Sequence, residues 1–204
     1  GRSFLSPKGT GLYLSVLLRP RFPAEEALSI TTAAAVAVAE AIDQLTGQQA
    51  KIKWVNDVFC RGKKVCGMLL EMNADEQSVH DVVAGIGINV HQTAFEGEIA
   101  KTASSLDLLT GRRICRADVV RAFLEEYEAV DELARQGGEA LMAVYRRHSA
   151  TLGQRVQVIS ATGSFTGTAK AVTDSGSLIV LDDDGREREV LAADVSVRGL
   201  MGYA

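Results

Sequence analysis

The sequence predicts an α+β fold in which helices cover a mixed or antiparallel sheet and a small all-β module follows. Three observations support this prediction. Residues 51–90 contain short apolar segments joined by tight turns, which favours antiparallel or mixed strand pairing over a doubly wound sheet. Two long segments, 24–46 and 118–136, carry apolar residues at helical spacing. After Ala150, glycines separate short strand-like segments at intervals of about ten residues, which is typical of a small β domain.

The composition is that of an ordinary soluble protein of one or two domains. The 204 residues are 47% hydrophobic and 24% charged, with a net charge of −4, which leaves no global electrostatic footprint for nucleic acid. No apolar stretch reaches membrane-spanning length without interruption by polar residues, and no secretory signal is expected at the start of the chain. The three cysteines lack metal-ligand spacing, which indicates reduced thiols and a cytoplasmic protein. The change in composition after Ala150 divides the chain into domains 1–150 and 151–204.

The first domain is expected to begin with a strand and a long helix. Residues 11–19 are interpreted as a central strand, because they are largely apolar and are bounded by prolines. Pro23 is well placed to start a helix, and the following helix extends to Thr46 with a stripe of alanines that lets it lie close to a sheet. Gly47 ends it.

The segment 82–90 predicts a buried strand, because it is almost entirely apolar and too short for an ordinary helix. Alternate residues of a strand share a face, so Gly85, Gly87 and Asn89 lie on one side and apolar side chains on the other. Glycine inside a strand often marks a place where a ligand or another backbone comes close. Tight packing of a helix is the alternative explanation.

A second block, 51–72, favours a nearby ligand over helix packing as the explanation of these glycines. Ile52 and Trp54 alternate with lysines, as in a half-buried strand, and Asn56-Asp57 has turn chemistry. Residues 61–64 are expected at a hairpin tip that leads into an apolar strand, 65–72. An ordinary turn and a solvated hairpin tip explain these features singly. A carboxylate, an amide and a lysine beside a strand with a bare face together indicate a ligand pocket.

The remaining elements follow from the same signals. Residues 104–111 predict a short helix closed by glycine, and a third helix is expected from Glu139 to about His148. The strands expected in the second domain are 155–159, 165–172, 177–181 and 195–198.

Ordered blocks of this sequence resemble the signature motifs of biotin protein ligases. The blocks are Ser6-Pro-Lys-Gly9 with Leu12-Tyr-Leu-Ser15, Lys53-Trp-Val-Asn-Asp57, Lys63-Lys-Val-Cys-Gly67-Met-Leu-Leu-Glu71, Gly85-Ile-Gly-Ile-Asn89 and Ser104-Ser-Leu106. The resemblance extends from the first residue to about Arg198. It implies a class II synthetase-like catalytic domain followed by an SH3-like β-barrel.

The resemblance also implies a two-step reaction. The carboxylate of biotin attacks the α-phosphate of ATP and gives biotinyl-5′-AMP and pyrophosphate. A lysine of a biotin carboxyl carrier protein, part of a carboxylase such as acetyl-CoA carboxylase, then takes the biotinyl group and releases AMP. Because two anions meet in the first step, Mg²⁺ and fixed cations are needed to neutralise the charge that develops.

Two cations are implied by the resemblance. Lys64 is expected to contact the carboxylate of biotin and a phosphate oxygen, and Arg2 to be the second cation. By strict alternation Lys64 lies on the face opposite to Gly67 and Leu69, so it must lie at the start of its strand or beyond a bulge. Lys63 is expected on the surface.

The same resemblance assigns the binding residues. Gly85 and Gly87 are expected to admit the fused rings of biotin, with Leu69 and Phe4 as apolar walls.

Other side chains are expected to bind the nucleotide. Asn56 and Asn89 are expected to bind ATP or its phosphates, and Asp57 to hold Mg²⁺ or to orient the acceptor amine. Val55 stands where the family has proline, which removes a restriction on φ in that turn.

Other candidates are assigned structural roles. Trp54 is expected to support the site from within the core. Cys60 and Cys66 are placed where they can face each other across the hairpin, but no histidine is placed to activate either thiol. The three histidines are expected to be surface or satisfied residues: His80, His91 and His148.

Two alternatives to biotin ligation stay open: a lipoate–protein ligase or acyltransferase, and a non-catalytic regulator that binds biotinyl-adenylate. The chain is expected to be N-terminally truncated, because only Gly1-Arg2 matches the end of the family's glycine- and arginine-rich loop. We therefore expect this chain to be nearly inactive or to release adenylate, while the complete protein is active. A homodimer through a sheet edge is a family-level expectation. A preceding DNA-binding domain and the identity of the acceptor carboxylase are left open by these residues.

Overall fold

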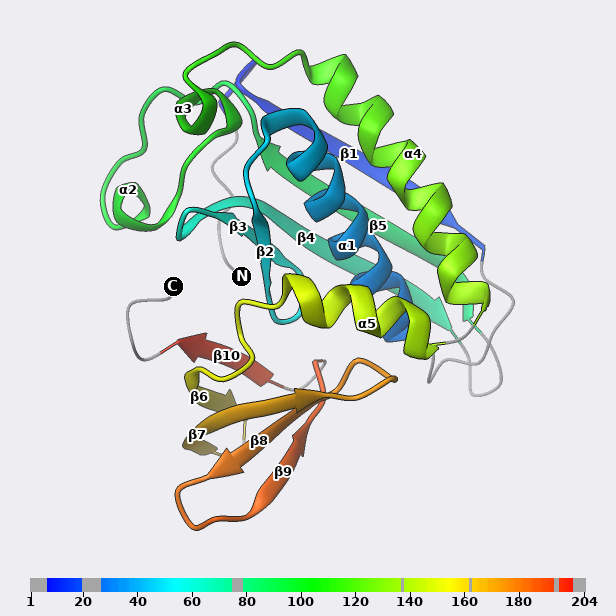
Figure 1. The fold of residues 1–204 in the computed structure, drawn as a ribbon, viewed down its shortest axis with the longest axis vertical. Coiled ribbons are helices and arrows are strands. Elements are labelled where there is room, and N and C mark those ends of the chain that lie inside the picture. Colours follow the sequence, from blue (N-terminus) through cyan, green and yellow to red (C-terminus); the bar gives the residue numbers. More distant parts are fainter. Residues whose placement is uncertain are drawn as a thin grey trace.

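The computed structural model describes residues 7–19, 27–74, 79–136, 138–161, 163–192 and 195–199. It confirms the predicted α+β class: two five-stranded sheets, both antiparallel throughout, and a group of helices over the first (Figure 1).

The first sheet has the strand order β1-β5-β4-β3-β2. The four strands from β2 to β5 are joined by tight connections, as residues 51–90 predicted. The expectation that 11–19 would be a central strand is wrong, because β1 lies at the sheet edge and pairs only with β5 among the described strands. After the buried Gly11, its residues alternate between half-buried and exposed, as in a strand covered on one face. The strands are β1 (Gly11–Leu18), β2 (Ala50–Lys53), β3 (Asp57–Cys60), β4 (Lys63–Ala74) and β5 (Val79–Asn89).

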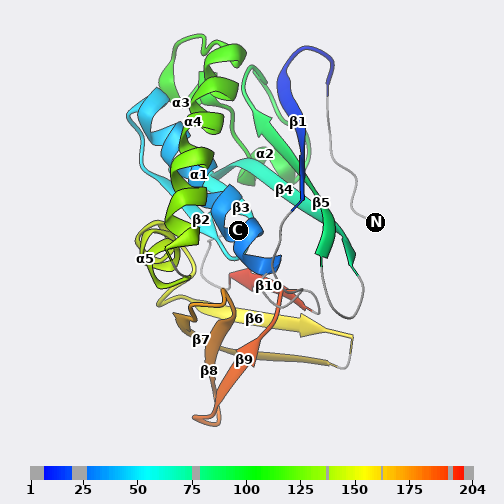
Figure 2. The same cartoon turned by 90° about the vertical axis from the view of Figure 1, so that its right-hand side faces the viewer.

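Three helices gather on one face of this sheet, which Figure 2 shows nearly edge-on. The central helix is α1 (Ala27–Thr46), and α4 (Arg116–Arg135) and α5 (Gly138–His148) pack against it. Residues 33–39 of α1 are at most 5% exposed, and small alanine side chains let the helix approach the sheet closely. Two short helices, α2 (Ile99–Thr102) and α3 (Leu106–Thr110), lie in the connection between β5 and α4.

The length and composition of α1 reflect its place in the core. Residues Leu28–Thr46 are long and apolar enough to cross a membrane by length and composition alone, and polar residues such as Glu40 and Asp43 interrupt them, as the sequence showed. In the folded chain 67% of this segment is buried. Packing against the sheet and two helices explains the apolar composition.

The second sheet has the order β10-β6-β7-β8-β9 and forms a small β domain. One of its strands, β9, was not predicted. Three of its four residues are charged and exposed, so the sequence has no apolar alternation there. The strands are β6 (Arg155–Ser160), β7 (Gly163–Val172), β8 (Leu178–Asp182), β9 (Glu187–Val190) and β10 (Val195–Gly199).

Candidate active site

The face of the first sheet opposite the helices carries a strip with few side chains. In the strand register, Tyr13, Gly87, Gly67 and Asp57 form one row across β1, β5, β4 and β3. Residues paired across strands share a face, so two adjacent glycines leave the middle of this row bare. The strip provides room for a ligand to lie directly on the backbone.

A second row borders the first. Ser15, Gly85 and Leu69 are paired across β1, β5 and β4, and Leu69 is 65% exposed. On the opposite face, Ile86 and Ile88 are at most 2% exposed. The alternation predicted for 82–90 therefore separates a packed face from an open one, and the open face has an apolar side chain beside the glycines.

A bulge brings Lys64 onto the open face. The register passes from Val58 paired with Cys66 to Phe59 paired with Lys64, so Val65 is an extra residue and its side chain is fully buried. An extra residue in one strand reverses the alternation of the residues before it. Lys64 is also the second residue of β4. It therefore lies both near the start of its strand and beyond a bulge, the two placements that the sequence allowed.

The Lys64 ammonium and the Asp57 carboxylate form an ion pair, with 2.6 Å between Nζ and Oδ1. Their side chains are 36% and 28% exposed, so both remain within reach of a ligand. A Cβ atom at Gly67 would lie 3.1 Å from Lys64 Nζ and 3.4 Å from Asp57 Oδ1. The glycine therefore accommodates this pair.

Asn56 lies next to the pair and is fixed by the adjacent strand. Its Nδ2 donates to the backbone oxygen of Met68 over 2.5 Å. Because the amide nitrogen is used in this way, the side-chain oxygen is the group that Asn56 offers to a ligand.

The segment at 103–105 links Lys64 to Asn89. The amide of Ser104 donates to the carbonyl of Lys64 over 2.9 Å, and Asn89 Nδ2 donates to the carbonyl of Ser104 over 3.1 Å. The Ser104-Ser-Leu106 block thus joins the start of β4 to the end of β5. Two predicted site residues that are 25 positions apart share one backbone support.

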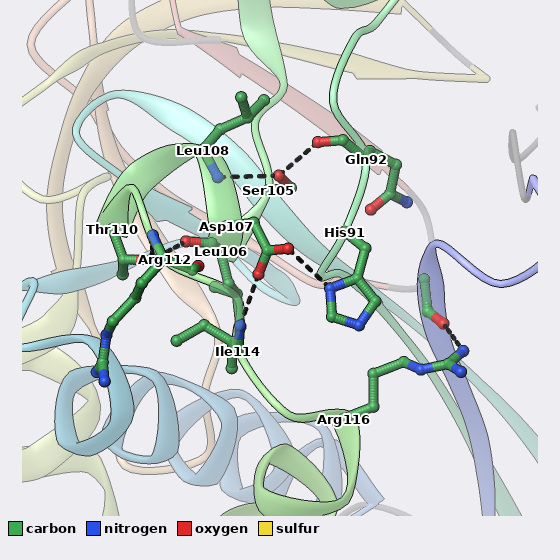
Figure 3. A network of polar contacts seen from close by, with 11 residues as sticks. His91, Gln92, Ser105, Leu106, Asp107, Leu108, Thr110, Arg112, Ile114 and Arg116 are labelled. Atoms are coloured by element: carbon green, nitrogen blue, oxygen red, sulfur yellow. Dashed lines mark hydrogen bonds and ion pairs between the residues drawn. The ribbon is translucent and has the colours of Figure 1, made fainter.

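Asp107 organises the loop beyond that segment (Figure 3). One carboxylate oxygen accepts from His91 Nδ1 over 2.8 Å and the other from the amide of Ile114 over 2.8 Å. The His91 side chain is 8% exposed, and its bond to Asp107 agrees with the prediction of a surface or satisfied residue. His148 is also buried, with Nδ1 on the carbonyl of Ala50 and Nε2 on Glu40.

Trp54 supports the turn before Asp57 from the side of the second domain. Its backbone amide donates to Thr151 Oγ1 over 2.8 Å and its indole nitrogen to the carbonyl of Gly176 over 2.9 Å. The ring is 6% exposed, so it is a core residue. The hydroxyl of Tyr145 adds a hydrogen bond of 3.2 Å to the carbonyl of Val55.

Several predicted residues do not join the site. Arg2 and Phe4 lie outside the described residues. Cys60 and Cys66 do not face each other, because Cys60 pairs with Lys63 and Cys66 with Val58. Burial raises the pKa of the Cys60 thiol to about 12 and also raises that of Cys66, which disfavours the nucleophilic thiolate at both positions.

Asp57 and Asn56 give a small set of oxygen donors for a metal ion. One carboxylate with a neighbouring amide oxygen fits a Mg²⁺ ion whose other ligands are phosphates and water. The only cluster of three potential ligands found among the described residues is Glu40, Asp43 and His148. It lies where α1, α5 and β2 meet, away from the open face, and its members are engaged in hydrogen bonds with protein groups.

Family models match both parts of the chain. Residues 1–89 match the biotin/lipoate A/B protein ligase family, and residues 151–198 match the biotin protein ligase C-terminal domain. The bifunctional ligase/repressor BirA of Bacillus subtilis is 33% identical over 96% of this chain. The biotin–[acetyl-CoA-carboxylase] ligase of Paracoccus denitrificans is 28% identical over 98% of this chain and 85% of its own length. The chain spans about three fifths of the BirA proteins it matches, 61% for the Bacillus protein.

Solved structures of biotin protein ligases are similar to this chain in fold. The ligand-free biotin protein ligase of Aquifex aeolicus superimposes with a TM-score of 0.83 at 29% identity, covering 93% of this chain and 83% of that chain. The same enzyme in complex with biotin and ATP gives a TM-score of 0.78 over 98% of this chain and 82% of that chain.

Proposed function

The chain belongs to the biotin protein ligase family, and from this premise we propose that it activates biotin with ATP and transfers the biotinyl group to a carrier-protein lysine. The observation that carries the proposal is the Lys64–Asp57 pair on the bare, glycine-lined face of the sheet. An ordinary surface ion pair has no need of a glycine strip beside it, whereas a planar ligand that lies on the backbone does.

Lys64 has a clear task in the first step. A carboxylate oxygen of biotin attacks the α-phosphorus, the bond from phosphorus to the bridging oxygen breaks, and pyrophosphate leaves. Negative charge accumulates where the two anions meet, and an ammonium already held at the site reduces that repulsion without reorganisation. The 2.6 Å contact with Asp57 holds the ammonium until an anionic substrate competes for it.

Asp57 and the glycines have separate tasks. In the second step a lysine amine attacks the carbonyl carbon of the mixed anhydride, AMP leaves, and the nitrogen loses a proton. A carboxylate near the reacting carbonyl orients the amine and accepts that proton. Gly85 and Gly87 with Leu69 form the apolar, backbone-lined surface proposed for the biotin rings. Mg²⁺ bound through Asp57 would supply charge neutralisation at the phosphates.

The decisive experiment compares Lys64→Met with Lys63→Met in protein produced from its whole gene. Lys63 is a matched control, because it precedes Lys64 and its ammonium is engaged by the backbone oxygen of Lys101. Each protein is incubated with Mg-ATP and biotin, and biotinyl-AMP is quantified by mass spectrometry. A charged hydrogen bond contributes about 1.5–3 kcal/mol, so Lys64→Met is expected to lower the rate about 10- to 150-fold. Equal activity of the two variants would remove Lys64 from the site.

Lipoate is the second candidate substrate, because the model that matches residues 1–89 describes biotin and lipoate ligases together. The same assay with lipoate in place of biotin separates them. We expect biotinyl-AMP and no lipoyl-AMP. Lipoyl-AMP as the only product would assign the chain to the lipoate branch, and the absence of both would leave a binding protein.

The carrier step needs its own measurement. A biotin carboxyl carrier domain of an acetyl-CoA carboxylase is added to preformed biotinyl-AMP, and biotin on the carrier is detected by intact mass. Asp57→Asn is expected to slow this transfer while the protein still binds biotinyl-AMP. Transfer at the parent rate would show that Asp57 has no part in the second step.

A further inference from the structure

The start of α4 forms one side of a basic pocket that lies outside the candidate active site. The pocket has a volume of about 510 Å³, and its lining consists of His91 and the segment 113–117. None of these residues belongs to the glycine strip or to the ion pair beside it. The helix α4 is part of the layer that covers the face of the sheet opposite that strip.

His91 brings a buried polar atom to this pocket. Its side chain is 8% exposed, and Nδ1 lies 2.8 Å from Asp107 Oδ2. Because a carboxylate can only accept, Nδ1 carries the hydrogen, and Nε2 of the neutral ring is then an acceptor. Nε2 has no hydrogen-bond partner among the residues that the structure describes. Figure 3 shows that edge of the ring turned away from Asp107, toward Arg116.

The surrounding bonds keep the ring in this orientation. The other oxygen of Asp107 accepts from the amide of Ile114 over 2.8 Å, and the Asp107 amide donates to the carbonyl of Val90 over 3.0 Å. The amide of His91 donates to the carbonyl of Thr10 over 2.6 Å. A ring turned over would place a carbon atom against the carboxylate and lose the bond to it. Nε2 therefore stays at the pocket.

The other groups at the pocket favour an anion. The exposed guanidinium of Arg113 has no ion pair among the described residues. Cys115 precedes α4 and gives its first turn no side-chain hydrogen bond, so backbone amides at the start of this 20-residue helix remain available to a ligand. The carboxylate in that turn, Asp118, is paired with Arg121 over 3.1 Å.

A ligand of this pocket thus needs negative charge together with a hydrogen that it can donate. Hydrogen phosphate has both, because its charged oxygens can accept from Arg113 and the helix amides while its O–H group donates to His91 Nε2. Sulfate has the charge without the hydrogen. A phosphate monoester loses its last hydrogen at about pH 6, so at pH 8 it also presents only acceptors, and the Nε2 atom is left unpaired against an oxyanion.

We propose that the pocket at the start of α4 binds inorganic hydrogen phosphate and that His91 Nε2 is the atom that selects it. Arg113 and the first amides of α4 supply the attraction for the anion, and Asp107 keeps the imidazole in the tautomer that accepts. The proposal is independent of the proposed function, because no residue of the candidate active site takes part in it.

The test follows the amide chemical shifts of residues 113–118 by NMR at pH 8, where histidine side chains are ordinarily neutral. Inorganic phosphate, sulfate or glycerol 3-phosphate is added at constant ionic strength. We expect saturable shifts with phosphate and dissociation constants about tenfold higher for the other two anions. Equal affinities of the parent for phosphate and sulfate would overturn the proposal, and so would the absence of saturable phosphate binding.

Two variants and a control separate the roles of the ring and the charge. His91→Asn keeps a donor for Asp107 and removes Nε2, so phosphate binding is expected to weaken about tenfold while sulfate binding is unchanged. Arg113→Gln is expected to weaken the binding of all three anions. Arg121→Gln removes an arginine of the same helix that is already paired, and it is expected to change none of them. A preference for phosphate that persists in folded His91→Asn protein would contradict the role of Nε2.

Asp107→Asn reverses the direction of the hydrogen bond to the ring. The new amide donates from Nδ2 to His91 Nδ1 while its Oδ1 still accepts from the amide of Ile114, so the ring hydrogen moves to Nε2. The pocket then presents donors only, and the preference for phosphate over sulfate is expected to disappear. A parent-like preference in this variant would show that the tautomer held by Asp107 does not select the ligand.

Discussion

The indole nitrogen of Trp54 donates a hydrogen bond of 2.9 Å to the backbone carbonyl of Gly176, which joins the turn before Asp57 to the second domain. The same tryptophan donates its backbone amide to Thr151, and Arg146 of α5 reaches the carbonyl of Val172 over 2.9 Å. The small β domain is therefore bound to the polypeptide that carries the candidate active site. Changes at this contact are expected to affect both parts of the chain.

Trp54→Phe keeps an aromatic ring and removes the indole donor. Because the Gly176 carbonyl then loses its buried partner, the free energy of unfolding is expected to fall by about 1–3 kcal/mol. Urea unfolding followed by far-ultraviolet circular dichroism measures this. Thr151→Val, which removes the acceptor for the Trp54 amide, is expected to act in the same direction. A change below about 0.5 kcal/mol, the usual effect of a surface substitution, would contradict the importance of the contact.

Gly67→Ala tests the space around the ion pair. The added Cβ would lie 3.1 Å from Lys64 Nζ and 3.2 Å from its Cε, closer than ordinary van der Waals contact, so the ammonium must move. We expect biotinyl-AMP formation to slow mainly through kcat. In the comparison variant Gly85→Ala, the nearest atom to the new Cβ is the Leu69 carbonyl at 3.4 Å. The ion pair then stays in place and the expected change is a higher KM for biotin. Identical effects of the two variants would argue against separate roles.

Glu40 gives a pH-dependent contribution to stability. Burial alone would raise the pKa of its carboxyl, but hydrogen bonds and charges from His148 and Arg147 outweigh burial and hold the pKa below its ordinary value of 4.5. A carboxyl with a lowered folded-state pKa stabilises the protein above the unfolded-state pKa, and this stability is lost as pH falls through the folded-state pKa. Glu40→Gln is therefore expected to destabilise the protein at pH 7 and to have less effect below pH 4.5.

Other groups around Glu40 must be considered when that experiment is interpreted. Burial raises the pKa values of Asp43 and Glu126. The negative charge of Glu40 raises both of them further. Both shifts work against stability at neutral pH, and removing the Glu40 charge weakens them. The comparison of Glu40→Gln with the parent should therefore be repeated in an Asp43→Asn background. An equal difference in unfolding free energy at pH 7 and pH 3.5 would contradict the assignment to Glu40.

The three thiols are expected to react very differently. Cys115 is exposed, whereas Cys60 and Cys66 are at most 1% exposed, and burial raises the pKa of Cys60 to about 12. In the native protein at pH 8, an aromatic disulfide reagent should titrate one thiol, and Cys115→Ser should abolish that reaction. The other two should react only after denaturation. Rapid native reaction of two or three thiols would show that the β3–β4 hairpin opens.

Much of this protein can be predicted from its sequence, because the decisive signals are local. Alternation over 82–90 separates the bare face of β5 from its packed face, and glycines and capping residues mark the ends of helices such as α3, where Ser105 accepts from the amide of Leu108. The motif blocks bring together the residues that the resemblance names, and Lys64 and Asp57 do meet in the structure.

Tertiary structure decides the rest. The alternation of apolar residues indicates that one face of β1 is covered. The place of β1 at the sheet edge depends on which strand it pairs with. The bulge at Val65 depends on the partner strand, and the hydrogen bond from Asn89 to the carbonyl of Ser104 joins segments that the local sequence does not relate. The sequence by itself determined most of the elements and their faces, because side-chain period and turn chemistry are properties of a few neighbouring residues, and the roles of the site residues stay predictions from the family resemblance. The register, the strand order and the orientation of each amide were decided only by contacts between distant segments, since hydrogen-bond direction depends on what lies across the gap.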